Sequence, residues 1–192
     1  ESIPRKISPM IRRRSTLSCT LALSACTLSA LCTACSAPEP YSGEVPAVAE
    51  TSSVQFGQSA ELVTRDLGHG VPVSWQATVF EPERIDATPD YPEVLCHTVI
   101  LSPSFIGDYP VDVTVPVPEF TSVNGELNAN FIKPDEAPEL CGVADEAPDG
   151  YTGDLEVGHE YRTVVASWDG LYGLPATEIT GTAGDQTVTW HK

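Results

Sequence analysis

From residue 54 to the end, apolar residues recur at alternate positions and proline occurs throughout, and this pattern most limits how the chain can fold. The clearest run is Val71, Val73, Trp75, Ala77 and Val79, with Ser74, Gln76 and Thr78 between them. Successive side chains of a strand point to opposite faces, so this period predicts strands with one buried face. We find no helical period in the region and expect no helix there.

Six further segments have the alternation or the β-branched composition of strands. They are residues 94–101, 111–117, 127–132, 160–168, 177–182 and 186–190. Asn124-Gly125 predicts a hairpin turn within residues 123–126, because both residues accept a positive φ. Residues 183–185 join the last two segments. Pro116 and Pro118 cannot donate to a ladder, so segment 111–117 is expected to end at a sheet edge.

Seven or eight short strands separated by turns are typical of an antiparallel β-sandwich. A closed barrel is the alternative arrangement. An α/β fold would need helical patterns of about 10–15 residues between the strands, and the sequence has none. We therefore predict one all-β domain over residues 54–192.

Residues 11–35 resemble a bacterial export signal that ends in a lipid-attachment cysteine. Residues 12–14 are all arginine, and residues 17–34 carry no charge. Few of these uncharged residues are large and apolar, whereas a spanning helix needs about 20 predominantly apolar residues. A cleaved signal is thus the better prediction, and residues 1–35 are expected to comprise upstream residues 1–9, before a start at Met10, and this lipoprotein signal. Residues 36–53, rich in Pro, Ser, Ala and Glu, are expected to form a flexible tether.

Two cysteines compete for the lipid anchor. Bacterial lipoprotein signals end in a Leu-small-small-Cys pattern, which residues 23–26 (LSAC) match fully. The match at residues 32–35 (CTAC) is weaker, but Cys35 stands where the apolar run ends. We predict acylation at Cys35, with Cys26 as the alternative; a secretory signal without a lipid is a further alternative. The anchor would hold the protein on the extracytoplasmic face of the cell membrane.

Cys96 and Cys141 are the two cysteines beyond the signal. An even pair in an exported chain predicts one disulfide. The bond would close a loop of about 46 residues, worth roughly 4 kcal/mol in the chain-entropy model. Two isolated cysteines without a CxxC spacing do not favour a metal site.

The part after residue 35 has 5 basic and 26 acidic residues, a net charge of −21. This charge opposes binding to nucleic acid and to anionic lipid. Asp145, Asp149 and Asp154 crowd one glycine-containing loop and are weak calcium candidates, since Ca²⁺ takes oxygen ligands from flexible loops. Their spacing fits no EF-hand, and a solvated acidic loop is the simpler interpretation. We expect no cofactor and no firm metal site.

Catalytic motifs are missing from the sequence. It has no G-x-S-x-G and no S-x-x-K pattern, and His159-Glu160 begins an H-E-x-x-H motif that lacks its second histidine. Trp75, Trp168 and Trp190 alternate with polar neighbours, which favours core packing. We therefore expect a protein that is not an enzyme.

The layout resembles the small immunoglobulin-like domains of exported actinobacterial lipoproteins. The resemblance lies in the alternating segment VDVTVPV, followed after a loop by LEVGHEY and then RTVVASW. It implies an immunoglobulin-like sandwich that binds or supports another envelope protein outside the membrane, without catalysis. A cation- or small-ligand-binding accessory lipoprotein, such as a sensor or transporter partner, is the alternative function.

Overall fold

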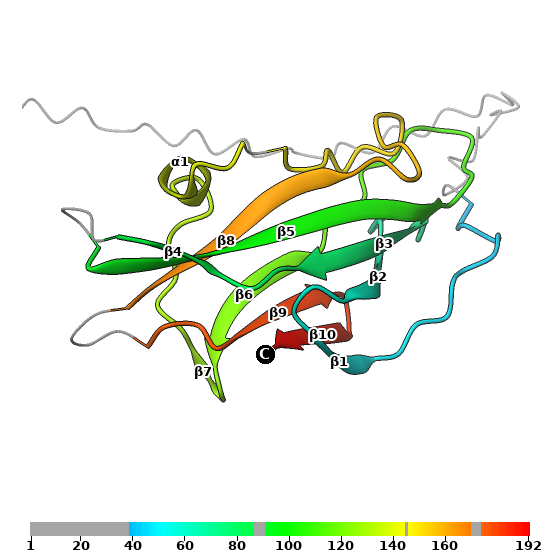
Figure 1. Ribbon diagram of the computed structural model, residues 1–192. Helices are drawn as coiled ribbons and strands as arrows, with labels where there is room; N and C mark the ends of the chain where they lie inside the picture. Colours follow the sequence, from blue (N-terminus) through cyan, green and yellow to red (C-terminus); the bar gives the residue numbers. More distant parts are fainter. Residues whose placement is uncertain (1–38, 87–90, 145, 170–173) are drawn as a thin grey trace, which may run out of the picture. The chain divides into compact units, whose positions relative to one another are not determined.

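The computed structural model describes residues 39–86, 91–144, 146–169 and 174–192. In these ranges the chain forms ten strands and one short helix, and the strands make two sheets (Figure 1). Apolar side chains of both sheets share one core. The domain is therefore an all-β sandwich, as the period-two alternation predicts. No helix within the described ranges has the length and apolar composition to cross a membrane.

One sheet has the strand order β1-β10-β9-β6-β7. Its strands are β1 (Thr51–Gln55), β6 (Glu119–Asn124), β7 (Leu127–Asn128), β9 (Glu178–Ala183) and β10 (Gln186–His191). β9 and β10 form the predicted final hairpin, with Gly184 at a positive φ in its turn. β1 pairs in parallel with β10, a long-range contact that local alternation does not predict.

The other sheet is built on β5 (Glu93–Ile106), which has 14 residues. β3 (Pro72–Val79) and β4 (Glu83–Ile85) pair with successive parts of one edge of β5, and β8 (Tyr161–Asp169) pairs with its other edge. β2 (Ser59–Arg65) completes the sheet beside β3. The predicted strands 94–101 and 160–168 are confirmed, and β5 continues beyond its predicted end.

The core lies between the two sheets and contains the alternating residues that the sequence singled out. The side chains of Val71, Val73, Trp75, Ala77 and Val79 are all 0% exposed. Trp190 of β10 is buried against them from the other sheet. Each apolar side chain withdrawn from water contributes on the order of 1.5–3 kcal/mol, which makes this layer the main stabilising element of the domain.

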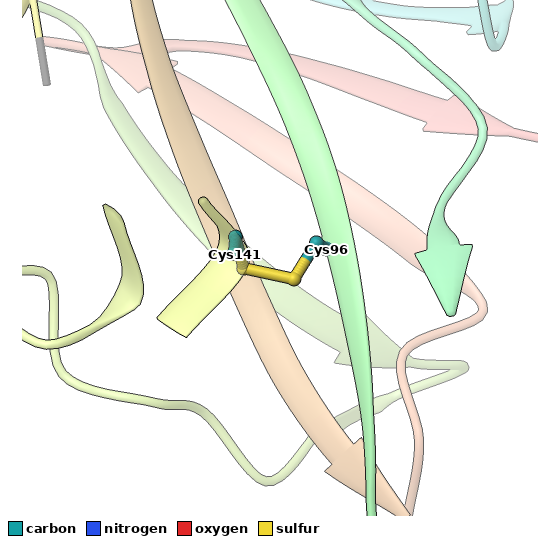
Figure 2. The surroundings of a disulfide bond; sticks show 2 residues. All are labelled: Cys96 and Cys141. Carbon is teal, nitrogen blue, oxygen red and sulfur yellow. A yellow bond between two sulfur atoms is a disulfide. The ribbon is translucent and has the colours of Figure 1, made fainter. Parts of the chain in front are cut away.

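A second apolar cluster covers the outer face of β5 and β8. Val94 and Cys96 alternate with residues that face the core, so they point outward. Helix α1 (Ala137–Cys141) packs over this outer face (Figure 1). Its last residue, Cys141, is disulfide-bonded to Cys96 (Figure 2).

The helix corrects the expectation that this region has none. Pro138 lies in its first turn, where a missing N–H costs nothing, and Gly142 ends it with a φ of 63°. A single helical turn is unstable alone. Packing and the disulfide therefore stabilise α1. Neither of these can be read from the local periodicity of the sequence.

Segment 111–117 is not a strand, which corrects another prediction. Val113 and Val115 are buried as the alternation requires, but Thr114 makes only an isolated bridge to Tyr151. The backbone of this segment pairs with the loop at residues 150–152, through Val115 N–H to Gly150 at 2.6 Å. The alternation was thus correct about the burial of Val113 and Val115, but Val111 is 54% exposed, and the predicted ladder does not form.

The β6–β7 hairpin turns one residue later than predicted. Asn124 is the last residue of β6 and pairs with Leu127, so the turn consists of Gly125 and Glu126, with a positive φ at Gly125 alone. The predicted strand 127–132 is also shortened to Leu127–Asn128. Beyond Asn128 the chain leaves this sheet and crosses to the edge of β8.

Part of the segment assigned to the tether contacts the domain. The N–H of Tyr41 donates to the carbonyl of His69 at 2.6 Å, and Tyr109 Oη donates to the carbonyl of Glu39 at 2.6 Å. β1 begins at Thr51, three residues before the expected start of the domain. Residues 39–50 are therefore not a free spacer, because their aromatic and backbone groups find partners on the sandwich.

Candidate functional site

A groove of about 820 Å³ opens between the two sheets at the side where β6 and β8 form their edges. Its walls are mainly apolar and come from both sheets and the crossing segment. They include Leu101, Val117, Phe120, Phe131, Val165 and Trp168. Small-ligand sites are concave, largely apolar and about 300–1,000 Å³ in volume, so the groove has the size and character of such a site.

The crossing segment explains why the groove exists. The N–H of Ala129 still donates to Ser122 of β6, but the N–H of Ile132 donates to Ala166 of β8 at 2.9 Å. Phe131 thereby forms an isolated bridge with Ser167. The segment covers the end of β8 from Ala166 to Trp168, and Glu146 bonds to the same edge at Arg162.

Val164 lies on the uncovered part of the β8 edge. In an antiparallel ladder, the N–H and C=O groups of alternate residues point to the same edge. Ala166 and Arg162 use this edge to accept bonds from Ile132 and Glu146. Between them, none of the described residues pairs with the outward backbone groups of Val164.

Two polar side chains that line the groove have atoms without a hydrogen-bond partner. Ser122 Oγ and Asn130 Nδ2 are both withdrawn from solvent and unpaired within the described residues. Ser122 as a whole is 1% exposed. An unpaired buried polar group costs about 1–3 kcal/mol, so each such group calls for an explanation, and a bound molecule is one that would satisfy it.

Nearby serine and asparagine side chains have hydrogen-bond partners. Ser167 Oγ accepts a bond from the N–H of Ala176 at 3.2 Å, and Asn124 Nδ2 donates to the carbonyl of Pro175 at 2.7 Å. Unpaired atoms are therefore not general to serine and asparagine at this end of the sandwich, although His69 Nδ1 and His97 Nε2, outside the groove, also have no hydrogen-bond partner among the described residues.

The groove has little charge. Among its described lining residues Glu119 is the one ionisable side chain, and it is exposed. No lysine, arginine or histidine belongs to this described lining. An anion would thus meet no positive partner, inside a domain that is strongly acidic overall.

A second, smaller cavity of about 580 Å³ adjoins the groove, shares Val117 and Glu119 with it, and extends beside β2 and the β9–β10 turn. Its described lining includes the ionisable residues Glu50, Arg65, Asp66 and Asp185. Burial acts to raise the pKa of Asp66, but bonds from the N–H groups of His69, Val71 and Gly68 outweigh it and lower that pKa. The Asp66 carboxylate is thus already hydrogen-bonded to the backbone of its own loop.

The residues predicted to carry the lipid or to bind calcium lie away from the groove or outside the described part of the chain. Cys35, Cys26 and Asp145 are outside the described residues. Asp149 Oδ1 accepts a bond from the N–H of Tyr151 at 2.9 Å, and the N–H of Asp154 donates to the Tyr151 carbonyl. In the described ranges no three His, Cys, Asp or Glu side chains gather as a metal site would require.

Sequence reasoning did not find the groove. It assigned Trp168 to core packing together with Trp75 and Trp190, which are fully buried, whereas Trp168 is half-buried and lines the groove. It also placed Asn130 and Phe131 in a strand. No local signal marks these residues, because the groove arises where the chain leaves one sheet for the other.

The fold and the groove together define a β-sandwich domain with a small-ligand-sized site. No protein-family model matches the sequence, and no curated protein matches it. Among solved structures, the chain is similar to MPT63, a secreted protein from Mycobacterium tuberculosis, at 17% identity and a TM-score of 0.44, over 73% of this chain and 96% of that chain.

Proposed function

We propose that this protein is a lipid-anchored, extracytoplasmic binding protein that holds a small apolar ligand in the groove between β6 and β8. The observation that carries the proposal is the pairing of an apolar cavity with two polar atoms, on Ser122 and Asn130, that have no partner among the described residues. A groove that was merely a packing defect would have no reason to collect such atoms, since each one lowers stability.

Export and anchoring rest on the sequence, with support from the disulfide. Residues 11–35 have the composition of a lipoprotein signal, and acylation is proposed at Cys35 or, alternatively, at Cys26. The Cys96–Cys141 disulfide fits an oxidising compartment outside the cytoplasm. Membership of the immunoglobulin-like lipoproteins of actinobacteria remains part of this proposal.

The groove supports binding better than catalysis. Its described lining includes the hydroxyls of Thr121, Ser122 and Thr163, but no histidine or lysine to act as a base toward them. Glu119, the lining carboxylate, is exposed. Nucleophilic catalysis needs a nucleophile within hydrogen-bond reach of a base, so we assign no catalytic step.

The test is mass spectrometry of the full-length protein extracted from its own membranes. Under native conditions we expect a non-covalent apolar adduct that denaturation releases. Under denaturing conditions we expect a chain beginning at Cys35 or Cys26 with a diacylglyceryl mass, two hydrogens lighter before reduction. An unlipidated chain in the medium would reject the anchor, and ligand-free protein that takes up none of a panel of apolar probes would reject the binding function.

The uncovered edge at Val164 favours a second candidate function. An extended segment of another envelope protein could contact the edge of β8 through the N–H and C=O groups of Val164, which no described residue pairs. Crosslinking from a photoreactive residue at Thr163 would then yield one discrete protein partner. This alternative keeps the anchor and replaces the small ligand by a peptide.

A further inference from the structure

We infer that the groove selects a neutral acyl lipid whose polar end, of the ester or hydroxyl type found in a monoacylglycerol, lies between Ser122 and Asn130. This inference rests on the proposed function and adds the class of ligand. Three properties of the groove support it: the absence of positive charge, the chemistry of the unpaired atoms, and the apolar surface beside them.

The charge of the groove limits which head group can bind. The described lining offers no cationic side chain and one exposed carboxylate, Glu119. Burying an anion without a partner is strongly unfavourable, and the net charge of −21 beyond residue 35 adds repulsion. A fatty acid anion or an anionic phospholipid is therefore a poorer occupant than an uncharged lipid with the same acyl chain.

The unpaired atoms specify the polar end. Asn130 Nδ2 is a donor and requires an acceptor oxygen, while Ser122 Oγ can donate or accept. The two residues are close, because Ala129, next to Asn130, donates its N–H to the carbonyl of Ser122 at 3.0 Å. An ester carbonyl beside a hydroxyl supplies both kinds of partner within one small head group.

The rest of the groove suits the acyl chain. Phe120 of β6 and Val165 of β8 form opposite walls, and Phe131 and Trp168 extend the apolar surface along the crossing segment. Phe131 is 65% exposed, so the apolar lining continues to the mouth of the groove. A peptide strand would use the Val164 edge but would leave this apolar length without a matching chain.

The experiment uses the quenching of tryptophan fluorescence in the full-length protein held in phosphatidylcholine nanodiscs. The probes are a brominated monoacylglycerol and an alkyl sulfate with the same brominated chain. Trp168 lines the groove, whereas Trp75 and Trp190 are fully buried in the core. We expect the neutral probe to quench at a concentration at least about tenfold lower than the sulfate, and Trp168→Phe to abolish the quenching.

Two variants locate the polar end. Ser122→Ala and Asn130→Ala should each weaken binding of the neutral probe by about tenfold, which corresponds to one hydrogen bond. Ser122→Ala should also leave the melting temperature of the ligand-free protein unchanged or higher, because it removes an unpaired hydroxyl. A merely structural serine would give a lower melting temperature. Asn124→Ala is the matched control, since Asn124 is satisfied by Pro175 and should keep full affinity.

The outcomes separate this inference from the proposed function. Quenching by the sulfate at equal or lower concentration would overturn the neutral class while keeping the groove as a binding site. Unchanged affinity in both Ser122→Ala and Asn130→Ala would overturn the placement of the polar end. Quenching by neither probe, or displacement of the lipid probe by an extended peptide that crosslinks to β8, would overturn the inference and leave the strand-addition alternative.

Discussion

Cys141, the last residue of a five-residue helix, is bonded to Cys96 near the start of β5, 45 residues earlier in the chain. The bond joins α1 to the outer face of β5, where the second apolar cluster lies. A short helix and the loops on either side of it are thereby attached to the longest strand of the domain.

Removing this bond is expected to destabilise the domain. Cys96→Ala with Cys141→Ala should lower the free energy of unfolding by about 2–4 kcal/mol, because the unfolded chain regains the freedom of a long loop. Urea denaturation with and without reductant measures the effect. The double variant should be insensitive to reductant, and equal midpoints for the wild type under both conditions would contradict the prediction.

Ser122→Ala and Ser167→Ala should have opposite effects on stability. Ser122 Oγ is buried without a partner, so its removal is expected to stabilise the ligand-free domain by up to about 1 kcal/mol. Ser167 Oγ accepts the N–H of Ala176, and its removal should cost about 1–3 kcal/mol by leaving that donor unsatisfied. Urea denaturation of the two variants gives the comparison, and a loss of stability in Ser122→Ala would show that this hydroxyl already has a partner.

Thr163→Phe is expected to block the groove. Thr163 is half-buried, lines the groove and lies on the core-facing side of β8. A larger side chain there should fill part of the 820 Å³ space and reduce binding of the neutral lipid probe by at least about tenfold, the equivalent of 1.4 kcal/mol. Thr180→Phe, at a half-buried position on the outer face of β9, is the matched control. Equal affinity in the two variants would argue against this site.

His97 should make stability depend on pH near neutrality. Burial lowers its pKa, against the opposing effect of its bond to the carbonyl of Phe80. The folded pKa is thus below the unfolded value of 6.5. Between the two values the unfolded state binds more protons, so stability falls as the pH drops below about 6.5 and is fully present above it. His97→Gln should flatten the dependence of the urea midpoint on pH between about pH 5 and 7, because it removes a group that binds its proton more readily in the unfolded state.

The control for this effect is His159→Gln, which changes an exposed histidine. It should keep the pH dependence of the wild type. If His97→Gln showed an unchanged slope across the same pH range, the stability change would have to come from groups other than His97.

Asp66 is expected to make stability fall at acid pH. Although burial acts to raise its pKa, three backbone N–H donors hold it below the usual value of 3.8. Its contribution is therefore present above that value and is lost as the pH falls through the folded pKa. Asp66→Asn should cost about 1–3 kcal/mol at pH 7, measured by urea denaturation. The exposed Asp108→Asn should have little effect, and equal losses in the two variants would contradict a specific role for Asp66.

The local sequence determined which side chains face the core. The positions Val71, Val73, Trp75, Ala77 and Val79 are buried as their alternation requires, because the strand period of two is a property of the backbone at each residue. The final hairpin also followed from local composition, with Gly184 in its turn. The pairing of Cys96 with Cys141 followed from cysteine count, since no other cysteine lies beyond residue 35.

The tertiary structure decided the features that depend on distant parts of the chain. β1 joins β10 in parallel, and α1 forms over a sheet face that the alternation does not reveal. The groove exists because the chain leaves β6 after Asn128 and joins the edge of β8 at Phe131. Sequence periodicity reports the face of a residue within its own strand, whereas a strand edge is open or covered according to which other segment reaches it.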